Sequence, residues 1–179
     1  LAGNNVAQNS DDYFHYKSLE QILAYLQGTS CAVETALTNT PPVIISNGDF
    51  TIPVGTAFVL TANATDSDRG NILTYCWEQT DNGIVTRASF GPTQVAGANF
   101  RSLRPTTDPS RYFPKLSEIS AGNLTQTNPG INTAWETVST VQRDLNFSLT
   151  VRDNATGGGQ ADSDEIRVSV TEDAGPFVV

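Results

Sequence analysis

Histidine and methionine are nearly missing from this chain of 179 residues, which contains one histidine and no methionine. A zinc site built from several histidines, or a helix carrying His-x-x-x-His, therefore cannot form from this chain alone. A Ser-His-Asp triad would have to use His15, and the sequence has no Gly-x-Ser-x-Gly turn to hold the serine. We favour the interpretation that His15 is a hydrogen-bonded or surface side chain.

Basic residues are also scarce, since 10 lysines and arginines stand against 19 aspartates and glutamates, for a formal net charge of -9. A surface of this sign repels phosphate backbones, so nucleic-acid partners are excluded. No apolar run approaches the roughly 20 residues of a membrane helix, and no basic start precedes an apolar stretch as in a signal peptide. We therefore expect no membrane span and no export signal within this segment.

The chain opens on Leu1 and contains only two lysines, Lys17 and Lys115, with abundant threonine and asparagine. The missing methionine predicts that an upstream part of a longer polypeptide precedes Leu1. The acidic, lysine-poor composition is typical of a bacterial protein that is secreted or held at the cell surface.

Residues 18–27 carry a helical signal. Ser18 and Gln21 have capping-box spacing, apolar residues follow at positions 19, 22, 23 and 26, and Gly28 supplies a stop. A helix this short needs a packing partner. It either docks on the rest of the chain or is the last helix of a neighbouring domain.

Beyond the paired prolines 41 and 42 the pattern changes to short runs rich in β-branched and aromatic residues. We expect strands at residues 43–45, 50–52, 57–62, 73–79, 145–151 and 166–170. Strands at this spacing without intervening helices predict a mainly β protein, an antiparallel β-sandwich of immunoglobulin type covering residues 39–174. Trp77 occupies the position of a core tryptophan in that fold.

Regular alternation fails over residues 80–142, here called the insertion, although it holds many aromatic residues. A loop of this length with so much apolar material is expected to be folded over one face or edge. We predict a short strand pair near residues 84–90 and an irregular stretch over 101–119. The insertion is also where a specific binding surface is expected, with Tyr112, Phe113 and Trp135 as candidate exposed aromatics for a sugar or a protein. The favoured alternative is that these aromatics pack the insertion onto the sandwich.

Acidic turns supply the hard oxygen ligands that calcium prefers. The candidate calcium ligands are Asp66, Asp68, Asp153, Asn154, Asp162 and Asp164. If the first of these loops, with Asp66 and Asp68, meets the third, with Asp162 and Asp164, at one end of the sandwich, a calcium site forms. The alternative is that Asp and Asn serve as turn formers that bond nearby backbone.

The two cysteines, Cys31 and Cys76, leave two alternatives open. Cys76 points away from the core if its neighbours at 75 and 77 point inward. A Cys31–Cys76 bridge would then tie the N-terminal part to the outer face of the sandwich. The favoured alternative gives Cys31 a partner outside this chain and leaves Cys76 buried and unpaired.

Several segments together resemble the region that follows the catalytic core in secreted bacterial zinc metallopeptidases of the reprolysin-like (metzincin) group. Residues 10–15 and 18–22 resemble the close of the peptidase domain in that family. In that family an immunoglobulin-like module follows, related to polycystic-kidney-disease-type and cadherin-like domains. The segments that resemble this module are residues 39–42, 51–58, 73–79, 100–102, 143–147 and 149–154. The zinc motif His-Glu-x-x-His-x-x-Gly-x-x-His and the Met-turn are both missing, so no catalytic residue is carried over.

The resemblance implies three parts: residues 1–38 as the end of a peptidase domain with a linker, 39–174 as the module, and 175–179 as the start of a linker to a further module. It implies a chain that is not an enzyme by itself, with zinc only in the absent catalytic part of the parent protein. Its implied partners are that peptidase domain, neighbouring modules, and a protein or polysaccharide substrate. The alternative function is a carbohydrate-binding or adhesion module that uses exposed aromatics of the insertion.

Overall fold

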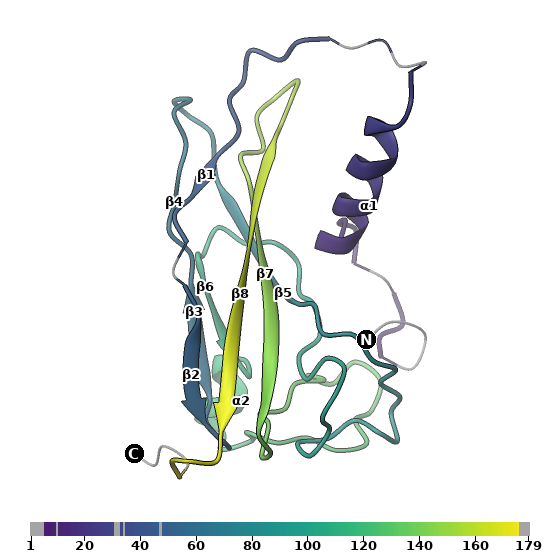
Figure 1. Ribbon diagram of the computed structural model, residues 1–179, viewed down its shortest axis with the longest axis vertical. Helices are drawn as coiled ribbons and strands as arrows, with labels where there is room; N and C mark the ends of the chain where they lie inside the picture. Colours follow the sequence, from purple (N-terminus) through teal and green to yellow (C-terminus); the bar gives the residue numbers. More distant parts are fainter. Residues whose placement is uncertain (1–5, 10, 31–32, 34, 47, 176–179) are drawn as a thin grey trace.

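A computed structural model describes residues 6–9, 11–30, 33, 35–46 and 48–175. These residues form two helices and eight strands, which are labelled in Figure 1. In chain order they are α1 (Tyr16–Gln27), β1 (Val43–Ile44), β2 (Phe50–Pro53), β3 (Phe58–Thr61), β4 (Ala64–Thr65), β5 (Thr74–Gln79), β6 (Ser110–Phe113), α2 (Leu116–Ser120), β7 (Arg143–Arg152) and β8 (Ala161–Thr171). Neither helix is long and apolar enough to cross a bilayer, as far as the described residues go.

The strands form a four-stranded sheet in the order β2-β8-β7-β5 and two two-stranded sheets, β1-β4 and β3-β6. The long β7–β8 hairpin forms the centre of the larger sheet, and β3 and β6 lie across from it in Figure 1. The fold is therefore mainly β with several sheets and a short helix, which is consistent with a β-sandwich. All six predicted strand segments are present.

The strand directions differ from the prediction in one place. β2 pairs with β8 in parallel, with Phe50 opposite Val168 and Pro53 opposite Thr171. The remaining strand pairs are antiparallel. The wholly antiparallel expectation was wrong here because side-chain alternation reports which face of a strand is buried, not the direction of its neighbour.

The core lies between the sheets, where aromatic and branched side chains interdigitate. Phe58, Phe100, Phe113 and Phe147 form an aromatic cluster with ring centroids 4.8 to 6.3 Å apart. Along β7 and β8 the inward positions are apolar and buried. Trp77 is buried as predicted, and its indole Nε1 donates to the carbonyl of Pro109 at 3.1 Å.

The insertion is ordered by buried polar contacts more than by regular structure. The Arg143 guanidinium, on β7, donates to the Gln94 carbonyl at 3.0 Å, to Asn99 Oδ1 at 2.8 Å and to the Gly97 carbonyl at 2.9 Å. Residues 84–90 form turns rather than the predicted strand pair, whereas 110–113 form β6. The prediction at 84–90 was wrong because the segment closes on itself through Thr86 and Ser89.

The predicted helix is present but begins two residues earlier, at Tyr16. The capping box is not used, because His15 is the N-cap residue and makes no side-chain cap bond. No residue of α1 is buried, and Ile22, Leu23 and Leu26 are 42%, 60% and 51% exposed. These three side chains are therefore not covered by the sandwich, and Figure 1 shows the helix to one side of the sheet.

Candidate functional site

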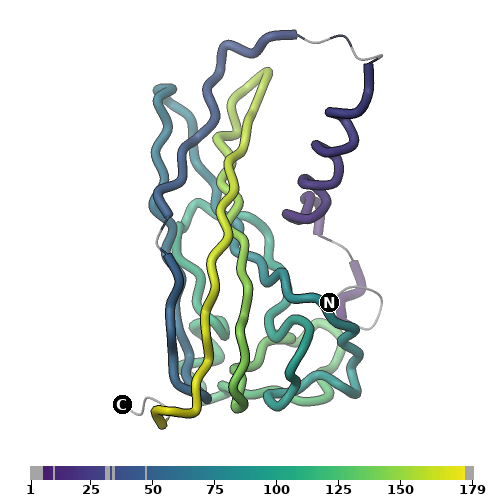
Figure 2. The backbone as a smooth tube through the Cα atoms, viewed as in Figure 1, coloured from purple at the N-terminus to yellow at the C-terminus, as the bar shows by residue number. Residues whose placement is uncertain are grey.

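Two of the acidic loops are linked at one end of the sandwich, but they are the loop of Asp66 and the turn at Asp153, not the expected pair with Asp162 and Asp164. Asn39 joins them: its side-chain amide donates to Asp153 Oδ2 and to the Gly158 carbonyl at 3.3 Å, while its Oδ1 accepts from the Asn71 side-chain amide at 3.1 Å. Asn71 also donates to Asp66 Oδ2 at 3.3 Å. Figure 2 shows the chain leading to β1 passing beside the turn between β7 and β8.

The carboxylates at this end are engaged by hydrogen-bond donors. Asp68 Oδ2 accepts from the Thr40 backbone amide at 2.6 Å, and Asp66 Oδ1 accepts from the Asp68 backbone amide at 2.7 Å. Asp153 is fully buried, and its Oδ1 accepts from the amides of Ala155 and Gln160 at 3.0 and 2.9 Å. Burial alone would raise the pKa of Asp153, but these bonds outweigh it and hold the pKa below its ordinary value.

The other candidate ligands serve neighbouring backbone. Asp162 Oδ2 accepts from the Ile44 amide at 2.9 Å, which ties β8 to β1. Asn154 donates to the Ile72 carbonyl at 2.7 Å. Asp164 lies within β8 opposite Leu149 and shares no hydrogen bond with the Asn39 network in the described part of the chain.

The residue types at this end of the sandwich suit calcium binding, but their hydrogen bonds suit a role in holding the loops together. The side chains of Asn39 and Asn71 connect the carboxylates of Asp66 and Asp153 through a chain of hydrogen bonds. Across the described ranges, no group of three or more His, Cys, Asp or Glu side chains is close enough to share a metal ion. Asn39 and Asn71, which sequence reasoning missed as site residues, are the links between the loops.

Two of the three candidate aromatics are unavailable to a ligand. Phe113 and Trp135 are completely buried, so their assignment as exposed binding residues was wrong. Phe113 belongs to the aromatic core, whereas Trp135 packs on Phe90 at 5.2 Å and donates from Nε1 to the Gly130 carbonyl at 2.9 Å. An indole whose N–H reaches a partner is stable in an interior. Tyr112 alone is partly exposed, at 39%.

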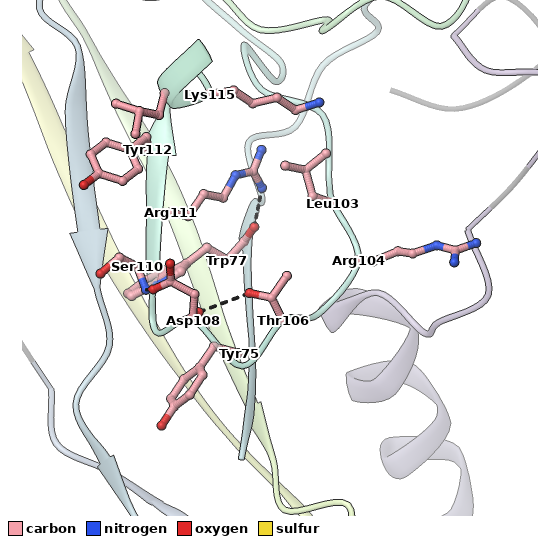
Figure 3. Close-up of a pocket in the computed structure, with 11 residues that line it drawn as sticks. Tyr75, Trp77, Leu103, Arg104, Thr106, Asp108, Ser110, Arg111, Tyr112 and Lys115 are labelled. Carbon is pink, nitrogen blue, oxygen red and sulfur yellow. Dashed lines mark hydrogen bonds between the residues drawn. The ribbon is translucent and has the colours of Figure 1, made fainter. Parts of the chain in front are cut away.

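Tyr112 lines a hollow of about 200 Å³ between β5 and β6, shown in Figure 3. Tyr75 and Leu116 add apolar surface to it, and Arg104 and Lys115 carry positive charge. The Arg111 side chain crosses the hollow, and its Nη1 donates to the Trp77 carbonyl at 2.5 Å. Arg104 is already paired with Asp11 and Asp12, at 2.9 and 3.0 Å.

A second polar site lies on the outer face of β5 and β7, where sequence reasoning expected only an outward Cys76. Cys76 and Glu78 stand opposite Thr150 and Ser148, and all four are buried. The Cys76 thiol donates to the Leu103 carbonyl at 3.4 Å. Burial first, then the nearby Glu78 charge, raises the pKa of Cys76 to about 12. We call these four residues the outer-face patch.

The cysteine alternatives are now separated in part. Cys76 is a free, buried cysteine under a segment of the insertion, as the favoured alternative predicted. Cys31 lies outside the described residues, as do positions 176–179 of the expected C-terminal linker.

The Glu78 carboxylate binds the N-terminal end of α1. Its carboxylate accepts from the Tyr16 backbone amide at 2.8 Å and pairs with His15 Nδ1. Burial by itself raises the pKa of Glu78, but the bonds from His15 and Tyr16 outweigh this effect and hold the pKa below its ordinary value. His15 is therefore a hydrogen-bonded residue that pairs with Glu78, in line with the structural interpretation of it.

Comparison with protein-family models, with curated proteins and with solved structures found no match for this chain.

Proposed function

We propose that this chain is a non-catalytic accessory module with an immunoglobulin-like sandwich, part of a secreted or cell-surface bacterial zinc metallopeptidase. In this proposal it scaffolds or spaces the catalytic domain and offers a surface to the protein or polysaccharide substrate. Zinc would be held by the peptidase domain and not by this chain. The motifs that resemble the reprolysin-like group support the family assignment.

The observation that carries the proposal is the uncovered apolar stripe of α1. Ile22, Leu23 and Leu26 are each more than two fifths exposed, although burying a leucine fully is worth about 1.5–3 kcal/mol. At its other end the helix is fixed to the sandwich through Glu78. A helix anchored at one end with its apolar face open is arranged to present that face to a neighbouring domain.

The first experiment is to read the natural coding sequence upstream of Leu1. A His-Glu-x-x-His-x-x-Gly-x-x-His motif followed by a Met-turn supports the proposal, and their absence overturns it. If the motif is found, the upstream domain is titrated with this chain in a calorimeter. Leu23→Asp should weaken the interaction, and Gln21→Asp, which places the same charge on the exposed opposite side of the helix, should not.

The alternative function, a carbohydrate-binding or adhesion module, now depends on the hollow beside Tyr112 instead of on an aromatic platform. Titration of soluble polysaccharides against the wild-type chain and Tyr112→Ala tests it. Binding that the substitution removes would favour the alternative.

For the acidic end we propose that Asp66, Asp68 and Asp153 act as hydrogen-bond anchors of the loops. The donors already seated on their oxygens support this role. Calcium binding by these residues is the competing proposal. The melting temperature in chelator and in millimolar calcium separates the two.

A further inference from the structure

The outer-face patch is unusual because an open sheet face normally carries solvated polar side chains. Here Cys76, Glu78, Ser148 and Thr150 are buried on that face. The cover is the chain segment before α1, residues 11–16, together with the start of the insertion near Leu103. We call residues 11–16 the strap.

The strap is held mainly by polar contacts. Arg152 on β7 donates to the Phe14 carbonyl at 2.9 Å, and Asp11 pairs with Arg101 at 3.4 Å. His15 and the Tyr16 amide both bind the Glu78 carboxylate. Since the first N–H groups of a helix have no intrahelical partner, Glu78 also serves as the anionic cap of α1.

The two partners of the central pair lie in different surroundings. The Glu78 side chain is 4% exposed, whereas the His15 side chain is 56% exposed. A buried carboxylate left without a positive partner is strongly disfavoured. The imidazole can exchange its proton with solvent, so the charge that balances Glu78 is set by the bulk pH.

We propose that the strap is a proton-controlled latch, in which protonated His15 holds residues 11–16 and the start of α1 on the outer-face patch through Glu78. Loss of the His15 proton leaves the buried carboxylate with only the Tyr16 amide and neutral hydrogen bonds. The strap then loosens, uncovers Cys76 and frees α1 to reorient. This inference concerns the chain itself and does not depend on the proposed peptidase partner.

Other charged and titratable groups face the pair from each side. The strap supplies Asp11 and Tyr13, whose ring lies 4.9 Å from the His15 ring. The sheet supplies Cys76 and Arg152, the insertion supplies Arg101, and α1 and β8 supply Lys17 and Glu165. Histidine is the side chain whose ordinary pKa lies closest to neutral pH, so His15 is the strap residue that the proposal invokes.

The direction of the pH effect follows from the two partners. The hydrogen bond with Glu78 raises the pKa of His15 above 6.5, although partial burial opposes it, so the contribution of His15 is lost as pH rises through the raised value. The pKa of Glu78 is lowered from 4.5, so its contribution is lost as pH falls through the lowered value. The latch is therefore closed most firmly between about pH 4.5 and 6.5.

The test uses the single histidine of the full chain, whose Hε1 proton gives one NMR titration curve. The His15 pKa should lie above that of a model peptide and fall toward it in Glu78→Gln, which keeps the shape of the side chain. The protection factor of the Tyr16 amide against hydrogen exchange should drop as pH rises through the measured His15 pKa. Arg69→Gln, which removes a charge from the exposed turn between β4 and β5, should change neither value.

Two results overturn the proposal. One is a His15 pKa that is the same in the wild type and in Glu78→Gln, with near-ultraviolet circular dichroism showing that both are folded. The other is a Tyr16 amide that stays equally protected from pH 5.5 to 9. His15→Asn serves as a second variant, in which Tyr16 protection should be low and independent of pH.

Discussion

Arg111 and Glu136 form an ion pair inside the protein, with Nη2 and Oε1 2.9 Å apart and side-chain exposures of 9% and 0%. The second Glu136 oxygen accepts from the Lys115 backbone amide at 2.7 Å. Arg111 also donates to the carbonyls of Trp77 and Arg101. The pair therefore joins β5, β6 and two parts of the insertion at one point.

Removing one member of this pair should be costly. Glu136→Gln leaves the buried Arg111 guanidinium without a negative partner, and Arg111→Met leaves the buried Glu136 carboxylate without a positive one. Each substitution should lower the free energy of unfolding by about 3–5 kcal/mol. Denaturant unfolding measures the loss. As a control, Arg167→Met breaks the exposed Arg167–Asp49 pair and should cost less than about 1 kcal/mol. Similar losses at both sites would show that Arg111 and Glu136 are not a buried pair.

Gly97 and Gly122 allow conformational strain to be separated from steric overlap. Their φ angles are +77° and +76°, but a Cβ at Gly97 would lie 2.4 Å from Val85 Cγ2, while one at Gly122 meets nothing within 4 Å. Gly122→Ala should cost about 1–2 kcal/mol from the left-handed backbone alone. Gly97→Ala should cost clearly more in the same denaturant titration. Equal costs would contradict the close packing of Gly97 on Val85.

Asp153→Asn should alter acid stability. Because the pKa of Asp153 is lowered in the folded state, its contribution is present above about pH 3.8 and is lost as pH falls through the lowered value. The variant should be less stable at pH 7 and should lose less stability on acidification than the wild type. The exposed Asp49→Asn is the control, and an identical pH profile for wild type and Asp153→Asn would contradict the prediction.

Calcium should change the melting temperature little if the acidic loops act as hydrogen-bond anchors. Melting is compared in chelator and in millimolar calcium, since an ion that binds only the folded state must stabilise it. A rise in melting temperature that disappears in Asp66→Asn would establish the calcium proposal instead. Asn39→Ala should lower the melting temperature in both buffers, because Asn39 links the two loops.

The Cys76 thiol should resist modification in the folded protein at pH 6, where the strap is closed. It is buried there, and its pKa of about 12 leaves almost no thiolate. In a Cys31→Ser background, a thiol reagent should label native protein slowly at pH 6 and label one thiol rapidly in denaturant. Rapid labelling at pH 6 would show that the strap does not cover Cys76.

The strands were predictable because their evidence is local. Leu145, Phe147, Leu149 and Val151 alternate with polar residues and indicate β7 without knowledge of any partner. The start of α1 was not predictable, since Glu78, more than 60 residues away, replaces the local cap at Ser18. The structure of the insertion could not be predicted either, because it depends on hydrogen bonds from the distant Arg143 and on the close packing of Gly97 against Val85.

The candidate site was predictable only in outline. Acidic turns were located correctly by their residue types, but their linkage depends on Asn39, whose amide carries no pattern in the sequence. The prediction of exposed aromatics was wrong for a related reason. The sequence around a tryptophan in a loop does not show whether its side chain is exposed or buried. The Gly130 carbonyl that accepts from Trp135 can be identified only in the structure.

The position of β8 between β2 and β7 has a consequence for how the chain is made. β2 leaves the ribosome early, yet its neighbour in the sheet is synthesised more than a hundred residues later. Until residues 161–171 emerge, β2 and β7 both expose an unpaired edge. We therefore expect nascent chains halted before β8 to be captured by chaperones or proteases, and the sheet to assemble late in synthesis.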